Sequence, residues 1–225
     1  MTINVDVVSD VVCPWCFIGK RHLDRALALW HEEHPASEVT VRWHPYFLNP
    51  DTPEAGEPYR PFLEKKFGGP KQLEELWQRV SEAGRTAGIE FAFEKIELRA
   101  NTLNAHRLIY HAQNHDSGVG AGATATAALV EALFAAQFLE GRHIGDRGVL
   151  ADVAAACGWK REAILRYLES AEDADAVRNA VEQAQRMGIR GVPFFMFNNK
   201  LAASGAQPPE ALLQAMREAG ANAPT

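Results

Sequence analysis

Two cysteines separated by two residues, in the run Cys13-Pro14-Trp15-Cys16, are the side chains best suited to chemistry in this sequence. A segment of β-branched and polar residues at 3–8 precedes them, and apolar residues at helical spacing follow them. At such a strand-to-helix junction the first cysteine lies beside unpaired backbone N–H groups and the positive end of the helix dipole. Both features stabilise a thiolate, so the pattern predicts thiol–disulfide exchange with Cys13 as the nucleophile.

The other residues of the motif have separate expected roles. Cys16 returns to roughly the same helix face one turn later, so we expect it to be buried and to resolve the mixed disulfide that Cys13 forms. Pro14 falls at the first helical position, where its missing N–H is no loss. Trp15 carries no charge, and we expect it to line the substrate surface, the alternative being a packing role at the start of the helix.

A structural zinc site and a chance spacing are the alternatives to a redox pair. Zinc needs two further ligands, and no second pair of cysteines or Cys/His set is present in the sequence. His111 and His115 have an i, i+4 spacing, but no Glu follows His111 as a metalloprotease motif requires. We therefore expect solvated or capping histidines and no metal, and we expect Cys157, in an Ala-rich helix end, to be a small buried residue.

The elements that position the motif follow from hydrophobic periodicity. After the strand at 3–8, a first helix is predicted from Cys13 to about Glu33, and residues 39–44 alternate as a second strand that Pro45 ends. The apolar residues of this helix are Phe17, Leu23, Leu27 and Trp30, and its outer face is expected to carry Lys20, Arg21, Asp24 and Arg25.

The end of the chain returns to strands. An apolar run at 191–197, a turn at 198–200, a short strand at 201–204 and a helix that starts at Pro208-Pro209 complete a β-β-α unit. Helix formers dominate residues 61–187, with about six helices, and residues 124–139 are expected to be buried on most sides. We therefore predict an α/β thioredoxin-like fold, in which residues 1–50 and 188–225 form a discontinuous domain and residues 51–187 an all-helical insertion.

Composition limits the compartment and the partners. The chain has 225 residues, of which 47% are hydrophobic and 23% charged, and a net charge of −6, which is unsuited to nucleic acid or anionic lipid. Three cysteines are too few for a disulfide-stapled secreted scaffold. With no basic leader and no apolar run of about 18 residues or more, the sequence predicts a cytoplasmic protein that binds neither membrane nor nucleic acid.

Two longer motifs give a specific resemblance. The run SDVVCPWCFIGK at 9–20, the run NTLNAHR at 101–107 and Gly191-Val192-Pro193 before the closing β-β-α unit resemble the DsbA superfamily of thioredoxin-fold proteins, and within it the FrnE-like dithiol-disulfide isomerase branch. From its residues alone, Pro193 would be an ordinary trans proline at a strand start, because only about 5–6% of X-Pro bonds are cis. The resemblance implies that Pro193 is cis and faces the cysteines, and that the backbone of Val192 binds an extended substrate.

The same resemblance defines the expected function and its alternatives. It implies a dithiol-disulfide oxidoreductase or isomerase with protein or peptide thiols and disulfides as partners, no cofactor beyond the Cys13–Cys16 pair, and glutathione as a candidate co-substrate. Glutathione-dependent enzymes that resemble 2-hydroxychromene-2-carboxylate isomerase share the scaffold, but they have a serine near the place of Cys13 and no resolving cysteine. A non-enzymatic module that holds unfolded segments is the third alternative. The presence of both cysteines favours redox chemistry.

Overall fold

Strand β1 (Thr2–Ser9) leads directly to the cysteine motif and lies inside a four-stranded sheet of order β2-β1-β5-β6. The computed structural model describes residues 2–114 and 123–221. β1 pairs in parallel with β2 (Glu38–Pro45) and antiparallel with β5 (Phe194–Phe197), which pairs with β6 (Leu201–Ser204). The sheet therefore joins the first and last parts of the chain, as the predicted thioredoxin-like fold requires.

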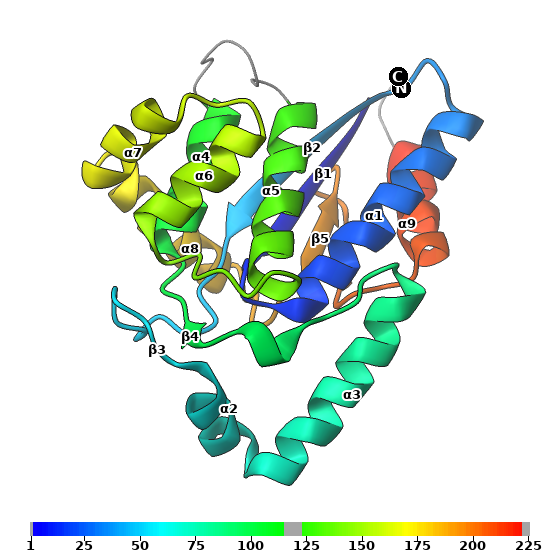
Figure 1. Cartoon of the computed structure of the whole chain (residues 1–225). Coiled ribbons are helices and arrows are strands. Elements are labelled where there is room, and N and C mark those ends of the chain that lie inside the picture. Colours follow the sequence, from blue (N-terminus) through cyan, green and yellow to red (C-terminus); the bar gives the residue numbers. More distant parts are fainter. Residues whose placement is uncertain (1, 115–122, 222–225) are drawn as a thin grey trace.

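Helices cover both faces of this sheet. Helix α1 (Pro14–Glu33) connects the two parallel strands and packs beside α9 (Pro209–Ala221), as Figure 1 shows. Successive β1 residues point to opposite faces, so Val5 and Val7 belong to the main core. Val8 instead packs with Ala184 of α8 (Ala174–Arg186) and with Ile189, which follows that helix. The two helical layers hold β1, and with it the cysteine motif, from both sides.

The insertion is helical except for one short pair of strands. Its described part contains seven α-helices, one more than the sequence suggested: α2 (Tyr59–Phe67), α3 (Pro70–Thr86), α4 (Leu103–Asn114), α5 (Ala123–Phe138), α6 (Arg147–Ala156), α7 (Arg161–Glu169) and α8. A 3-10 turn, η1 (Phe93–Lys95), and the two-residue strands β3 (Glu57–Pro58) and β4 (Leu98–Arg99) complete it. The all-helical expectation is wrong here because strands this short carry no periodicity, and the ion pair between Glu57 and Arg99 joins them.

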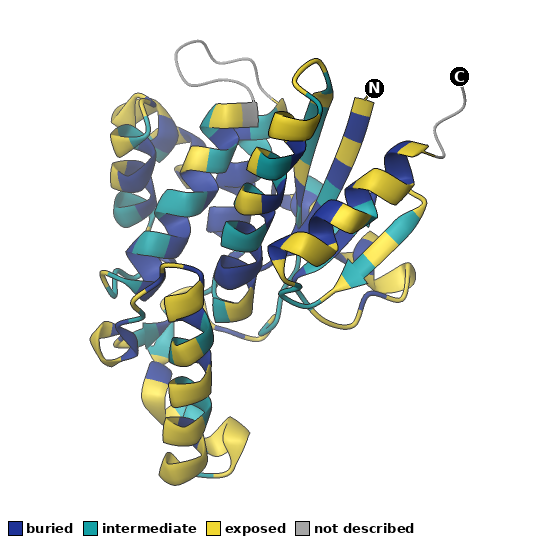
Figure 2. Ribbon diagram, turned by 90° about the vertical axis from the view of Figure 1, so that its right-hand side faces the viewer, coloured by how far each residue is buried: buried dark blue, intermediate teal, exposed yellow. Residues whose placement is uncertain are grey.

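Aromatic packing connects the insertion to α1. The Phe17 ring stacks on Phe134 of α5 with centroids 5.1 Å apart, and it meets Phe91 edge-on at 6.1 Å. Most described side chains of α5 are buried or half-buried, as expected for residues 124–139. In Figure 2 the exposed residues form the outer faces of the helices, while the buried ones face the sheet or another helix.

One expectation about the face of α1 is wrong. Lys20, expected on the outer face, is buried, and its Nζ lies 2.6 Å from a carboxylate oxygen of Glu131 in α5 and 2.8 Å from Asp24. The acidic partner on α5 compensates the buried charge, and no pattern within α1 reveals that partner. Within the described residues no helix is long and apolar enough to cross a membrane.

Candidate functional site

Cys13 is the N-cap of α1, so its thiol lies at the positive end of the helix. Its backbone is extended, with φ −98° and ψ 112°, and Pro14 occupies the first turn. The Cys13 N–H donates to Asp10 O at 2.9 Å, and the Cys13 carbonyl accepts from Cys16 N at 3.0 Å. The turn that Asp10 closes thus places the thiol at the helix start, where unpaired N–H groups favour a thiolate.

Val192 and Pro193 lie directly against this thiol. The Val192–Pro193 peptide bond is cis, as the resemblance implies. The Cys13 Sγ lies 3.7 Å from the Val192 carbonyl oxygen, at the distance of a weak S–H···O hydrogen bond. Cys13 follows β1 and Val192 precedes β5, and the antiparallel pairing of these two strands places the residues side by side. The fold thus brings together two motifs from opposite ends of the chain.

The two cysteines differ in environment and in expected ionisation. Both are free thiols, and the exposed fraction is 5% for Cys13 and 1% for Cys16. Burial raises the pKa of Cys16, and a hydrogen bond and the negative charge of Cys13 raise it further, while contacts with Asp10 and Ser9 act in the opposite direction. Burial and the neighbouring Cys13 therefore both favour the protonated form of Cys16.

A cavity of about 400 Å³ opens beside Cys13. Its walls come from the start of α1, from α2, α3 and α5, from β4 and from the segment before β5, and most of its lining is apolar. Trp15, 39% exposed, lines this cavity. The main lining residues are Cys13, Trp15, Tyr59, Leu63, Lys66, Trp77, Phe93, Arg99, Gln137 and Val192.

Tyr59 and Lys66 bring polar groups to this cavity that sequence reasoning did not single out. Burial, and then the negative charge of Cys13, raise the pKa of Tyr59. Burial and the neighbouring charge of Arg99 lower the pKa of Lys66, whose Nζ donates to Asn49 Oδ1 at 2.9 Å. These residues belong to elements far from the motif in sequence, and no local spacing signals that they meet it.

A buried polar pair lies behind the motif. Asp10 is fully buried, and its carboxylate accepts from Leu48 N at 2.8 Å and contacts His106 Nε2 at 3.2 Å. His106, in α4, is 4% exposed. The run at 101–107 therefore contacts the turn before Cys13. The pattern of the sequence does not reveal the pairing of Asp10 with His106, because 96 positions separate the two residues.

Arg107, in the same run, joins α4 to the end of α7 and the loop that follows it. Its buried guanidinium donates to the carbonyls of Tyr167, Leu168, Ser170 and Glu172, which lie at the end of α7 and in the loop that follows. These bonds fasten α4 to the loop between α7 and α8. At the start of the run, the Asn101 side chain accepts from Leu103 N, the first residue of α4, and donates to Thr52 O.

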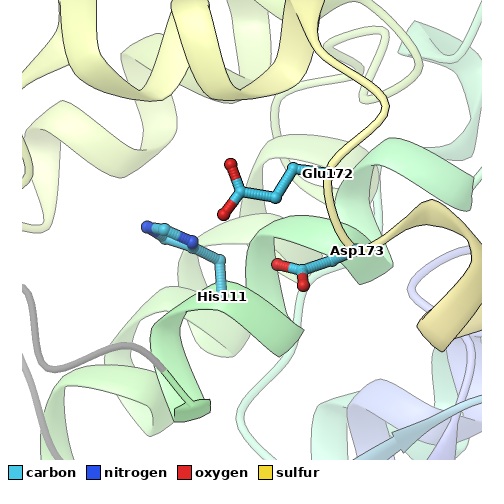
Figure 3. A group of neighbouring side chains, drawn as sticks. All are labelled: His111, Glu172 and Asp173. Carbon is cyan, nitrogen blue, oxygen red and sulfur yellow. The ribbon is translucent and has the colours of Figure 1, made fainter.

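One cluster has the donor types of a metal site, away from the cysteines. Ligand atoms of His111, Glu172 and Asp173 all lie within 4.8 Å of one another, and Figure 3 shows the three side chains pointing toward a common space. The Tyr167 hydroxyl donates to the Asp173 carboxylate at 3.0 Å, and this bond helps to hold the loop against α4. His115, the other member of the histidine pair, lies outside the described residues.

Cys157 caps the C-terminus of α6 and is half-buried rather than fully buried as expected. Its Sγ lies 3.9 Å from the carbonyl oxygen of Ala128 in α5, and partial burial raises the pKa of its thiol. The helix ends at the surface of the insertion, so only one side of this cysteine is covered.

Comparison with known proteins identifies the family. The DSBA-like thioredoxin domain family matches residues 4–217. Protein YwbO of Bacillus subtilis is 26% identical over 208 residues, which cover 92% of both chains. The crystal structure of a probable DsbA oxidoreductase from Streptomyces coelicolor is 26% identical, with a TM-score of 0.85 over 99% of this chain and 92% of that one. A 2-hydroxychromene-2-carboxylate isomerase structure shares the fold, with 20% identity and a TM-score of 0.67 over 96% and 95% of the two chains. The chain belongs to the DSBA-like thioredoxin domain family.

Proposed function

We propose that this chain is a dithiol-disulfide oxidoreductase that works by thiol–disulfide exchange through Cys13 and Cys16. The observation that carries the proposal is the position of the Cys13 Sγ, at the N-terminus of α1 and 3.7 Å from the Val192 carbonyl. The helix end supports a thiolate, and the backbone beside the cis proline offers a hydrogen-bonding edge to an extended substrate. On the motif at 9–20 we place the chain in the FrnE-like branch.

The first step forms a mixed disulfide. The Cys13 thiolate attacks one sulfur of a substrate disulfide, the S–S bond breaks, and the other substrate sulfur leaves as a thiolate that takes a proton from solvent. A thiolate no longer donates to the Val192 carbonyl. Ionisation of Cys13 therefore frees this carbonyl to accept an N–H from the substrate.

The second step releases the reduced substrate. In the free enzyme the charge of Cys13 helps to keep Cys16 protonated. Once Cys13 is bound in the mixed disulfide, its charge is gone, and the pKa of Cys16 falls. Cys16 then loses its proton, attacks the Cys13 sulfur and expels the second substrate thiolate, so the attack by Cys16 is coupled to formation of the mixed disulfide.

A reductant must restore the pair for the next cycle. Two molecules of glutathione, which leave as glutathione disulfide, or one dithiol fulfil this role in the proposal, and the reverse sequence oxidises dithiols. The direction depends on the reduction potential of the pair against a cytosolic value of roughly −220 to −320 mV. We place the activity in the cytoplasm, which the low cysteine content supports.

Trapping tests the assignment of the two cysteines. In cell extract, Cys16→Ser is expected to accumulate mixed disulfides through Cys13 that dithiothreitol releases, whereas Cys13→Ser forms none and Cys157→Ser, the matched control, behaves as the parent. Absence of trapped species in Cys16→Ser, or equal trapping in Cys13→Ser, contradicts the proposal. Glutathione conjugation that survives Cys13→Ala would instead support the glutathione-dependent transferase or isomerase alternative.

A further inference from the structure

The cavity beside Cys13 has the dimensions of a small-molecule site. Its volume of about 400 Å³ lies in the range of pockets that enclose low-molecular-weight ligands. Cys13 lines it and is only 5% exposed. A flat protein surface does not reach a thiol in this position, whereas a small molecule or a thin flexible segment does.

Apart from Cys13 itself, the charged side chains that line the cavity are positive. Lys66 and Arg99 are the two cations among its lining residues in the described chain, and no Asp or Glu belongs to that lining. The Lys66 Nζ donates to the neutral amide of Asn49, and burial lowers the pKa of Lys66. An anion bound here would stabilise the charged form of Lys66.

Two residues that line the cavity each carry a buried polar atom with no hydrogen-bond partner within the described structure. Gln137, 1% exposed, has an Oε1 that accepts no hydrogen bond, and Arg99, 6% exposed, has an Nε that donates none. Glu57 pairs with the other end of the Arg99 guanidinium and does not line this cavity. Buried polar groups are normally satisfied, so these two atoms point to a ligand that offers both an acceptor and a donor.

We propose that this cavity selects a low-molecular-weight disulfide or thiol with an apolar body and an anionic group, which Lys66 and Arg99 bind while its sulfur meets Cys13. The rings of Tyr59, Trp77 and Phe93 form the apolar wall, stacked in series at 6.4 and 5.3 Å between centroids. This substrate class rests on the proposed function. It makes a small acidic molecule, rather than a folded protein, the preferred substrate.

Two aromatic disulfides of different charge test the proposal in single-turnover reactions of the reduced protein. The dianionic probe is dithiobis-nitrobenzoate and the neutral probe is dithiodipyridine. With either one, Cys13 attacks the probe disulfide, one aryl thiolate leaves, and Cys16 then displaces the second. The protein pair is oxidised, the probe is reduced to two thiols, and two protons leave the protein thiols, so both reactions are followed by absorbance.

Lys66→Gln is expected to raise the half-saturating concentration of the dianionic probe roughly fivefold at low ionic strength, and Lys66→Glu to raise it further. The limiting rate, and the reaction with the neutral probe, report any change in the reactivity of Cys13 itself. The half-saturating concentration of the neutral probe should change less than about twofold. Lys65→Gln, a neighbouring lysine on α2 outside this cavity, is the matched control and should leave both probes unchanged.

The outcomes separate this inference from the function on which it rests. An equal response of the two probes to Lys66→Glu, with Cys13–Cys16 oxidation intact, overturns the anionic substrate class and leaves the oxidoreductase proposal standing. If wild-type protein yields no Cys13–Cys16 disulfide with either probe, the proposed function fails and this inference fails with it.

Discussion

The Sγ of Cys13 lies 3.7 Å from the carbonyl oxygen of Val192, and 179 positions of sequence separate the two residues. Val192 and Pro193 directly precede β5, which pairs with β1, and so they lie beside the motif. Helix α1 must approach them closely to keep this contact. Gly19, one turn into α1, permits that approach. A Cβ at Gly19 would lie 2.8 Å from Pro193 Cγ and 3.2 Å from Phe195 Cζ.

Gly19→Ala is therefore expected to lower both stability and thiol exchange. Alanine favours a helix by about 1 kcal/mol, but overpacking against Pro193 costs about 1–3 kcal/mol, so we expect a net loss in the free energy of unfolding. Displacement of Pro193 should also slow the reaction of Cys13 with a disulfide probe. Urea unfolding and probe kinetics measure the two effects, and Arg25→Ala, on the exposed side of the same helix, should alter neither. A Gly19→Ala variant as stable and as fast in thiol exchange as the parent would show that α1 does not pack tightly against Pro193.

The raised pKa of Cys16 predicts a loss of stability at alkaline pH. The unfolded chain releases the Cys16 proton near pH 8.5, whereas the folded protein keeps it to higher pH. The free energy of unfolding of the reduced protein should thus fall above about pH 8.5, by up to about 1.4 kcal/mol per pH unit for this group. The difference in unfolding free energy between Cys157→Ser and Cys157→Ser/Cys16→Ser isolates the contribution of Cys16. The tyrosines are the same in both variants, so their ionisation cancels in this difference. Parallel curves of unfolding free energy against pH for the two variants would contradict the prediction.

The Asp10 carboxylate predicts a large effect from a residue outside the motif. Asp10→Ala leaves the Leu48 N–H and His106 without their buried acceptor, which we expect to cost about 2–4 kcal/mol of unfolding free energy. Asp10→Asn retains an acceptor and should cost less, and Asp51→Ala, at an exposed position, should cost little. Equal losses for Asp10→Ala and Asp51→Ala would show that the buried carboxylate does not hold the turn before Cys13.

Sequence patterns predicted the elements whose apolar residues recur at regular short spacing along the chain. The strand at 3–8, the helix that starts at the motif and the closing β-β-α unit follow from periodicity and from prolines at helix starts. The bounds of α1, Pro14–Glu33, agree with the prediction to within one residue. Resemblance, rather than periodicity, supplied the cis bond at Pro193.

What sequence did not predict depends on contacts between distant elements. Lys20 was assigned to an outer face because Glu131, its buried partner, belongs to another helix. Likewise, Lys66 and Arg99 line the same cavity as Cys13 because α2 and β4 pack around it. No spacing along the chain encodes these neighbours, so the charge of this cavity emerged only from the structure.

A redox titration of the Cys13–Cys16 pair tests the central claim most directly. The protein is equilibrated in glutathione buffers from roughly −320 to −120 mV, quenched in acid, alkylated and analysed by peptide mass spectrometry. The account predicts one two-electron transition from two alkylated thiols to a Cys13–Cys16 disulfide, while Cys157 does not join that disulfide. A stable glutathione adduct on Cys13 with Cys16 still a thiol, or two cysteines that stay reduced throughout, would contradict it.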